Sequence, residues 1–144
     1  MKLELEEIKK LIPHRHPFLF VDSCEIIEKG NKGVGYRKFL PDEYFFNGHF
    51  PNKPIVPGVI LIESLAQTAG IVVSHYLSEI SDLSVLFTSV SNAKFRRPVV
   101  PNDQIFFEVS FLNKVKSVYK FYGQAKNKSQ IVCESSFSAM IIGK

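Results

Sequence analysis

The longest apolar stretch of the chain begins at Val59 and continues to about Ile80. Its hydrophobic residues fall on nearly every side of a helix, which is typical of a helix enclosed by protein on all sides. Pro57 suits the first turn of this helix, where a missing N–H is harmless. A much shorter helix is predicted near the start of the chain, where apolar residues recur at helical spacing up to Pro13. The pattern therefore predicts one short packing helix and one long central helix.

Strand-like spacing occurs in six segments, two before the long helix and four after it. These segments are residues 17–30, 32–40, 85–95, 104–114, 117–127 and 129–142. The period is clear in the fourth, where Ile105, Phe107, Val109 and Phe111 share one face. Turn formers separate the segments, namely Gly30, Asn31 and Gly33 in the first pair and then residues 98–103, 114–117 and 127–129. Consecutive strands are therefore expected to pair, which gives an α+β fold with an antiparallel sheet wrapped around one long central helix.

Length and composition add limits to this picture. The chain has 144 residues, 45% of them hydrophobic and 22% charged, so residues 1–144 are expected to form a single packed domain. Polar residues at 63, 64, 67 and 68 interrupt the apolar stretch, and we expect no membrane-spanning segment. The first residues, MKLELEEIKKLIPH, lack the apolar region of a secretory signal. A soluble, cytoplasmic protein is expected.

Charge and potential metal ligands narrow the function classes. The net charge is +4, but the basic residues are scattered among acidic ones and no nucleic-acid motif is present, so we expect no nucleic-acid partner. Cys24 and Cys133 have neither a disulfide framework nor a metal-ligand spacing, which indicates buried reduced thiols. His14 and His16 lie two residues apart without a third ligand at a matching spacing. We expect no metal and no cofactor, and a turn at His14 that ends the first helix and packs near the site.

The segment FNGHFPNKPIVPGVILIESLAQTAG joins an irregular loop to the start of the long helix. Residues 41–56 have no period but hold several aromatics, which indicates an ordered loop. His49 in that loop is a candidate base and Glu63 in the helix a candidate acid, because burial favours the protonated form of a carboxyl group. Gly58 would expose N–H groups at the positive end of the helix, where they can hold an oxyanion. The plainer alternatives are a structural hydrogen bond for His49 and, for Glu63, solvent or a bond to Gln67.

The chain resembles the (3R)-hydroxyacyl-acyl-carrier-protein dehydratases of type II fatty acid synthesis, the FabZ type. The resemblance extends over almost the full length and rests on GHFPNKPIVPGVILIESLAQTAG, on LIPHRHPFLFVD upstream and on KFRRPVVPND downstream. It implies the hotdog fold, a sheet wrapped around a long helix. By the motif, His49 corresponds to the family's catalytic histidine and Glu63 to its catalytic glutamate. Gly58, with Val59, corresponds to the helix start that binds the thioester carbonyl.

The resemblance also implies the reaction. His49 would remove the α-proton of a 3-hydroxyacyl thioester while the Gly58 amide holds the carbonyl oxygen, and Glu63 would protonate the leaving hydroxyl or position a water. The product is a trans-2-enoyl thioester. A version in which His49 alone shuttles the proton stays open. Two other activities also stay open: a hotdog thioesterase, although these commonly lack the loop histidine, and a non-catalytic acyl-thioester-binding protein.

Partners follow from the same resemblance. It implies acyl carrier protein as the carrier of the 3-hydroxyacyl chains. Lys94, Arg96 and Arg97 form the densest basic cluster, and they are either a dock for this acidic carrier or an ordinary solvated strand end. The resemblance also implies a homodimer with shared active sites, in which His49 of one subunit lies beside Glu63 of the other, and a hexamer built as a trimer of dimers.

Overall fold

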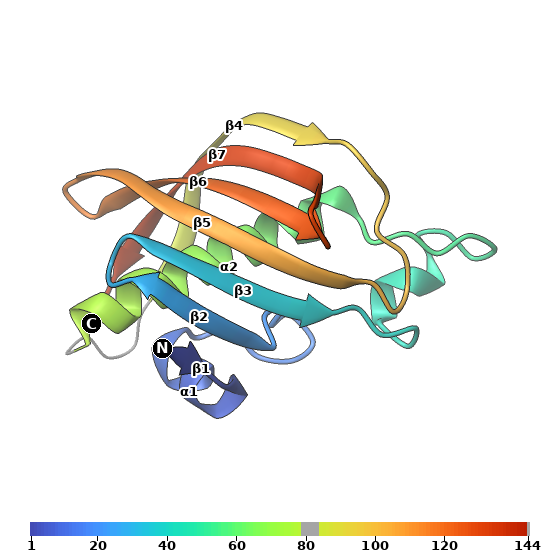
Figure 1. The fold of residues 1–144 in the computed structure, drawn as a ribbon, viewed down its shortest axis with the longest axis horizontal. Helices are drawn as coiled ribbons and strands as arrows, with labels where there is room; N and C mark the ends of the chain where they lie inside the picture. The colour runs from blue at the N-terminus through green and yellow to red at the C-terminus, as the bar shows by residue number, and fades with distance from the viewer. Residues whose placement is uncertain (79–83, 144) are drawn as a thin grey trace.

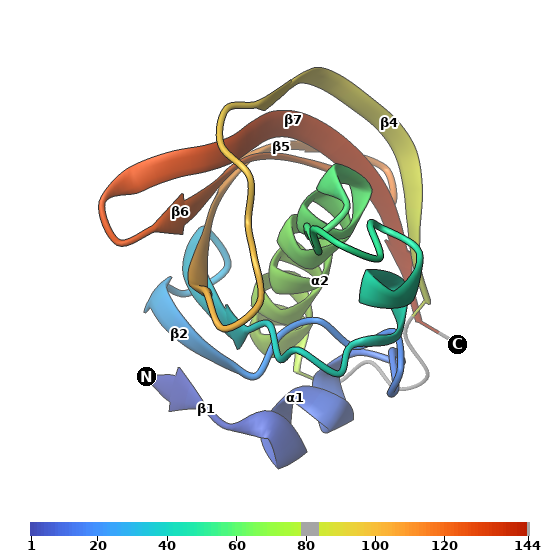
Figure 2. The ribbon, with the colours of Figure 1, turned by 90° about the vertical axis from the view of Figure 1, so that its right-hand side faces the viewer.

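A curved sheet and one long helix make up the main layers of the molecule (Figures 1 and 2). The computed structural model describes residues 1–78 and 84–143. Within them, one antiparallel sheet has the strand order β1-β2-β3-β5-β6-β7-β4. The strands are β1 (Lys2–Leu3), β2 (Ser23–Glu28), β3 (Lys32–Lys38), β4 (Ser84–Phe95), β5 (Gln104–Val115), β6 (Val118–Asn127) and β7 (Gln130–Ile142). The helices are α1 (Leu5–Leu11), the 3-10 turn η1 (Tyr44–Asn47) and α2 (Gly58–Leu77).

Helix α2 lies in the concave face of the curved sheet (Figure 2). Nearly all its residues from Ile60 to Ser74 are buried. Two of the buried polar side chains are hydrogen-bonded within the helix, because the Ser64 and Thr68 hydroxyls donate to the backbone carbonyls four residues earlier. This arrangement confirms the predicted α+β hotdog fold with an enclosed central helix.

The ends of α2 differ slightly from the prediction. Pro57 caps the helix at its N-terminus instead of lying in its first turn, and Leu77 is its last residue. The predicted end at Ile80 lies outside the described residues. By length and composition alone, α2 is long and apolar enough to cross a membrane. However, 78% of its most apolar window is buried inside the fold, as in the core helix of a globular protein.

The β2–β3 hairpin also departs from the prediction at two points. The spacing predicts a strand from residue 17, but β2 begins at Ser23. The backbone groups of Phe18 and Phe20 bind the side chain of Gln67 instead of a neighbouring strand. Gly33 is predicted in the turn but lies within β3, where a Cβ would come within 2.5 Å of Val72 on α2. This glycine therefore serves the close packing of sheet and helix.

The pairing of β4 is the main correction to the predicted topology. Consecutive pairing predicts β4 beside β5, but β4 pairs with β7, while β5 pairs with β3. The reason is that residues 96–103 form a crossing segment rather than a tight turn (Figure 1). Within it, the carbonyl of Val99 accepts from the Val56 N–H, and the Asn102 N–H donates to the carbonyl of Phe39. The segment is thus bonded to the loop before α2 and to the end of β3.

The two cysteines lie in the core on different strands. Cys24 and Cys133 are both free and buried, which confirms the prediction of buried reduced thiols. Burial raises the pKa of each thiol to about 12. Neither thiol is therefore a nucleophile near neutral pH.

Candidate functional site

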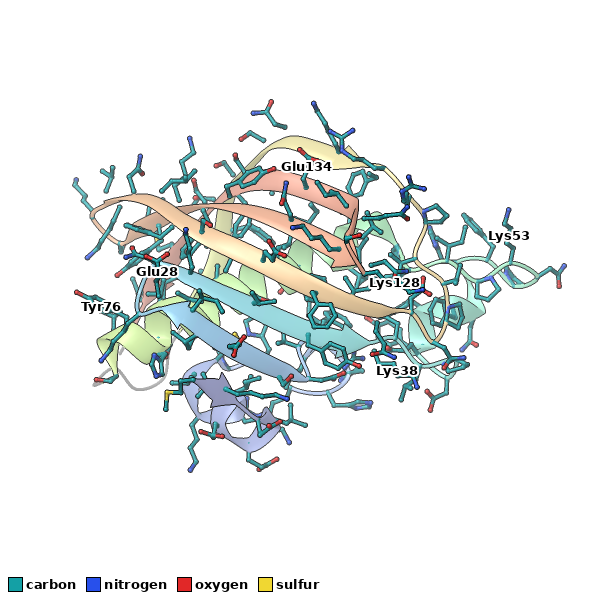
Figure 3. The ribbon with its side chains drawn as sticks, in the orientation of Figure 1. Glu28, Lys38, Lys53, Tyr76, Lys128 and Glu134 are labelled. Carbon is teal, nitrogen blue, oxygen red and sulfur yellow. The ribbon has the colours of Figure 1, made fainter. Side chains whose placement is uncertain are left out.

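The loop that carries His49 is held by reciprocal hydrogen bonds. The Ile55 N–H donates to the carbonyl of His49, and the His49 ring Nδ1 lies 2.9 Å from the carbonyl oxygen of Ile55. The Phe50 ring stacks on the imidazole with 4.2 Å between the ring centres. Lys53 marks the projecting tip of this loop in Figure 3. The imidazole is therefore fixed in position even though it lies in a loop.

This hydrogen bond also determines which ring nitrogen can act as a base. The carbonyl oxygen of Ile55 can only accept, so Nδ1 of His49 must carry the hydrogen. In the neutral imidazole, Nε2 then has a free lone pair. The structural hydrogen bond considered above as an alternative role for His49 is present, and it leaves Nε2 as the ring nitrogen that can accept a proton.

Five of the residues singled out in the sequence line one cavity of about 420 Å³ beside the start of α2. They are His49, Gly58, Val59 and the pair Arg96 and Arg97, and Phe95 joins them. A larger hollow of about 560 Å³ lies on the outer face, between β1, β2, β3 and β5, and contains none of these residues. The candidate site is therefore placed in the smaller cavity, because that cavity is lined by the candidate residues.

The start of α2 supplies backbone donors to the cavity. The Ile60 N–H bonds to the carbonyl of Pro57, whereas the first amides of a helix have no partner within it. A Cβ on Gly58 would lie 2.6 Å from the ring of Phe95, so a side chain at this position would displace that ring. The glycine therefore keeps the Phe95 ring close to the helix start. Phe95 was not among the predicted site residues. The only signal in the sequence that relates to it is the glycine at position 58, which leaves room for its ring.

Glu63 lies on α2 with its side chain 18% exposed and faces the segment around His14 instead of the His49 cavity. Its Oε2 accepts a hydrogen bond of 3.0 Å from Nε2 of Gln67, which is the plainer alternative considered from the sequence. Oε2 also lies 3.5 Å from Nε2 of His14. The predicted packing of the His14 turn near the candidate site is therefore observed at Glu63.

The structure of one chain does not bring His49 and Glu63 into a single pocket. Glu63 follows Gly58 by five positions, and five residues rotate about 140° around a helix. The candidate base and the candidate oxyanion donor consequently share one cavity, while the candidate acid lies on another side of α2.

The basic cluster divides into paired and unpaired members. Nε of Arg96 donates to Oε2 of Glu134 over 2.7 Å, and Glu134 is labelled near the β4 edge of the sheet in Figure 3. This hydrogen bond holds the pKa of Glu134 below its usual range and raises that of Arg96. Lys94 lies opposite Glu134 in the strand register. Arg97, which is exposed and lines the cavity, has no ion pair within residues 1–78 and 84–143.

Comparison with known proteins adds to this geometry. Residues 12–136 match the family model described as the FabA-like domain. A protein of Granulibacter bethesdensis named 3-hydroxyacyl-acyl-carrier-protein dehydratase FabZ is 46% identical over 97% of this chain and 83% of its own length. A protein of the same name from Sinorhizobium medicae is 43% identical, over 98% of this chain and 91% of its own length.

Solved structures show the same fold at low sequence identity. A chain of the dehydratase heterocomplex ApeI:P from Xenorhabdus doucetiae has a TM-score of 0.79 and 12% identity. The similarity covers 95% of this chain and 91% of that one.

Proposed function

Because the chain belongs to the FabA-like family, we propose that it dehydrates (3R)-hydroxyacyl-acyl-carrier protein to the trans-2-enoyl thioester in type II fatty acid synthesis. Residues 1–144 act as one domain in this proposal, in the cytoplasm. The observation that carries it is the environment of His49, whose Nδ1–H is bound to a carbonyl and whose Nε2 is left free beside the start of α2.

In the proposed reaction, Nε2 of His49 removes the proton from the carbon next to the thioester carbonyl. The negative charge that develops on the carbonyl oxygen is held by the amides of Gly58 and Val59 at the positive end of α2. The bond between C3 and its hydroxyl oxygen then breaks, and that oxygen takes a proton from Glu63, directly or through a water. A C2–C3 double bond and a molecule of water result.

The proposed active unit is a homodimer, in which Glu63 of one subunit completes the cavity of the other. Strand β4 supports this assembly, because every residue except Val85 is exposed and only its β7 side is paired within the described part of the chain. It exposes apolar side chains, including Leu86 at 57% and Phe95 at 54%. A long, exposed apolar edge strand promotes aggregation unless another chain covers it. A trimer of such dimers is the larger assembly we propose.

The carrier is proposed to approach at the cavity mouth. Acyl carrier proteins are acidic, and the exposed Arg97 guanidinium lies on the cavity lining. Arg96 is paired with Glu134 and is therefore less available. The proposed dock thus relies on Arg97 more than on Lys94 or Arg96.

Incubation with a 3-hydroxyacyl pantetheine thioester tests the activity. We expect enoyl absorbance to appear without release of free thiol, and the reverse reaction from the enoyl thioester. Release of thiol would identify a thioesterase, and binding without turnover would identify a non-catalytic acyl-thioester-binding protein.

Mixing two inactive variants tests the shared site. A refolded mixture of His49→Ala and Glu63→Ala should regain activity, because a mixed dimer holds one site with both groups. Light scattering of the purified protein gives the assembly. No recovery in mixed dimers that demonstrably form would contradict the shared site.

A further inference from the structure

Two side chains lie beside Oε2 of Glu63: Gln67, which donates a hydrogen bond to it, and His14, whose ring lies 3.5 Å away. Gln67 is completely buried, and its Oε1 accepts the Phe20 N–H over 2.8 Å. Since that backbone group can only donate, the orientation of the amide is determined. Nε2 of Gln67 must then point to its other two partners, the carbonyl of Phe18 and Oε2 of Glu63, each at 3.0 Å. Gln67 is therefore a fixed donor to one carboxylate oxygen.

His14 faces the same oxygen from the turn after α1. Its Nε2 lies 3.5 Å from Oε2 of Glu63, and the two side chains are only 14% and 18% exposed. Its Nδ1 is buried without a hydrogen-bond partner among the described residues. A proton on Nδ1 would therefore be an unsatisfied buried donor. In the neutral ring, the hydrogen therefore belongs on Nε2, on the side of Glu63.

We propose that His14 is a positioning residue for dehydration, which acts through Glu63. Two N–H groups, from His14 and Gln67, face Oε2, so the transferable proton of the protonated acid resides on Oε1. Once Glu63 has given up this proton, the same two N–H groups stabilise the carboxylate that remains. His14 thereby directs the proton and strengthens the acid. This inference rests on the proposed role of Glu63 as the acid.

Arg15 is the charged residue that follows His14 in the same turn. The guanidinium of Arg15 donates to the carbonyls of Lys9, Ile12 and His14, and so fixes the backbone of the turn. In the proposed dimer, the partner subunit's His49 faces Glu63 across the substrate. The kcat profile across pH is therefore compared between variants and not assigned to a single group.

Two substitutions at one position separate the N–H donor from the bulk of the ring. In His14→Gln the amide nitrogen reaches the place of Nε2 and keeps a donor toward Glu63. In His14→Asn the amide nitrogen falls at the place of Nδ1, too short to reach it. The exposed His16 offers a matched control, His16→Asn. All are compared with the intact protein by kcat and KM on a pantetheine thioester across pH, with thermal unfolding as the check on folding.

His14→Asn should lower kcat about ten-fold, the equivalent of about 1.4 kcal/mol for a hydrogen bond to a charged group, with KM unchanged. The high-pH limb of the kcat profile should move to higher pH, because the carboxylate form of Glu63 has lost a donor. His14→Gln should stay within about two-fold of the intact protein with the limb in place, since its N–H makes the same bond. His16→Asn should match the intact protein.

Some results would overturn the inference. These are an unshifted profile in His14→Asn, equal shifts in both His14 variants, or a uniform loss of kcat that follows a loss of thermal stability. A different result would show that the proposed role of Glu63 as the acid is wrong: in that case Glu63→Gln would keep full turnover. If no turnover is found at all, titration of the Glu63 carboxyl carbon by ¹³C NMR makes the same comparison between the His14 variants.

Discussion

Substitution of His49 can remove the proposed base, Nε2, while keeping the hydrogen bond to the Ile55 carbonyl that anchors the side chain. In His49→Asn, the amide N–H takes the place of Nδ1–H and can still donate to the carbonyl of Ile55, but no atom takes the place of Nε2. In His49→Leu, both the base and the anchor are lost. The two variants therefore differ in stability but not in chemistry.

The expected magnitudes follow from this geometry. A general base contributes about 10²–10⁴ in rate, so both variants should lose at least a hundred-fold in kcat. His49→Asn should unfold within about 1 °C of the intact protein, because the Ile55 bond is kept. His49→Leu leaves that carbonyl unpaired, at a cost of about 1 kcal/mol, which is about 3 °C in a domain of this size.

The assay measures enoyl formation from a 3-hydroxyacyl pantetheine thioester and thermal unfolding on the same preparations. If His49→Asn kept more than a tenth of the turnover, Nε2 could not be the base. If the Asn variant lost as much stability as the Leu variant, the bond from Nδ1 to Ile55 would not be the anchor.

Substitutions at further positions test the surroundings of the site. Gly58→Ala should reduce turnover more than ten-fold with little change in Tm, since its Cβ would displace the ring of Phe95 (2.6 Å), and adding Phe95→Ala should restore part of the activity. Arg97→Glu should raise KM for carrier-linked substrate but not for the pantetheine thioester, and added salt should have the same effect. Arg96→Glu should instead lower Tm and affect both substrates, because it breaks the ion pair to Glu134 on β7. Gln67→Leu should cost about 2–4 kcal/mol in urea unfolding, because it removes the partners of the buried Phe20 N–H and of the partly buried Phe18 carbonyl. A cost below about 1 kcal/mol would contradict the role of Gln67 as a fixed donor.

The strands and the long helix could be predicted because their signals are local. In β5, Ile105, Phe107 and Val109 are all buried, as the two-residue period requires. Which strands pair is not a local property. The prolines of residues 96–103 read as a turn, but the segment crosses the end of the sheet and leaves β4 beside β7. Strand β1, with two residues, is too short to show any period.

The candidate site was only partly accessible from the sequence. His49 and Gly58 do line one cavity. By contrast, the fixed tautomer of His49 depends on a carbonyl six residues away, whose direction no pattern predicts. The pairing of Arg96 with Glu134 depends on the register of β4 against β7, which became known only with the topology.

The short separation of His49 and Glu63 in the sequence suggests a single site, but the helix turns the acid away from the base within one chain. The two-fold axis of the proposed dimer would resolve this conflict, because the same segment would then give its candidate base to one site and its candidate acid to the other. The exposed edge of β4 independently calls for a second chain, since it leaves Leu86 and Phe95 uncovered. Phe95 belongs to both observations, because it lies on that edge and packs over Gly58. Assembly and completion of the site would therefore be one event, and dilution that separates the subunits should abolish turnover in proportion to the monomer formed.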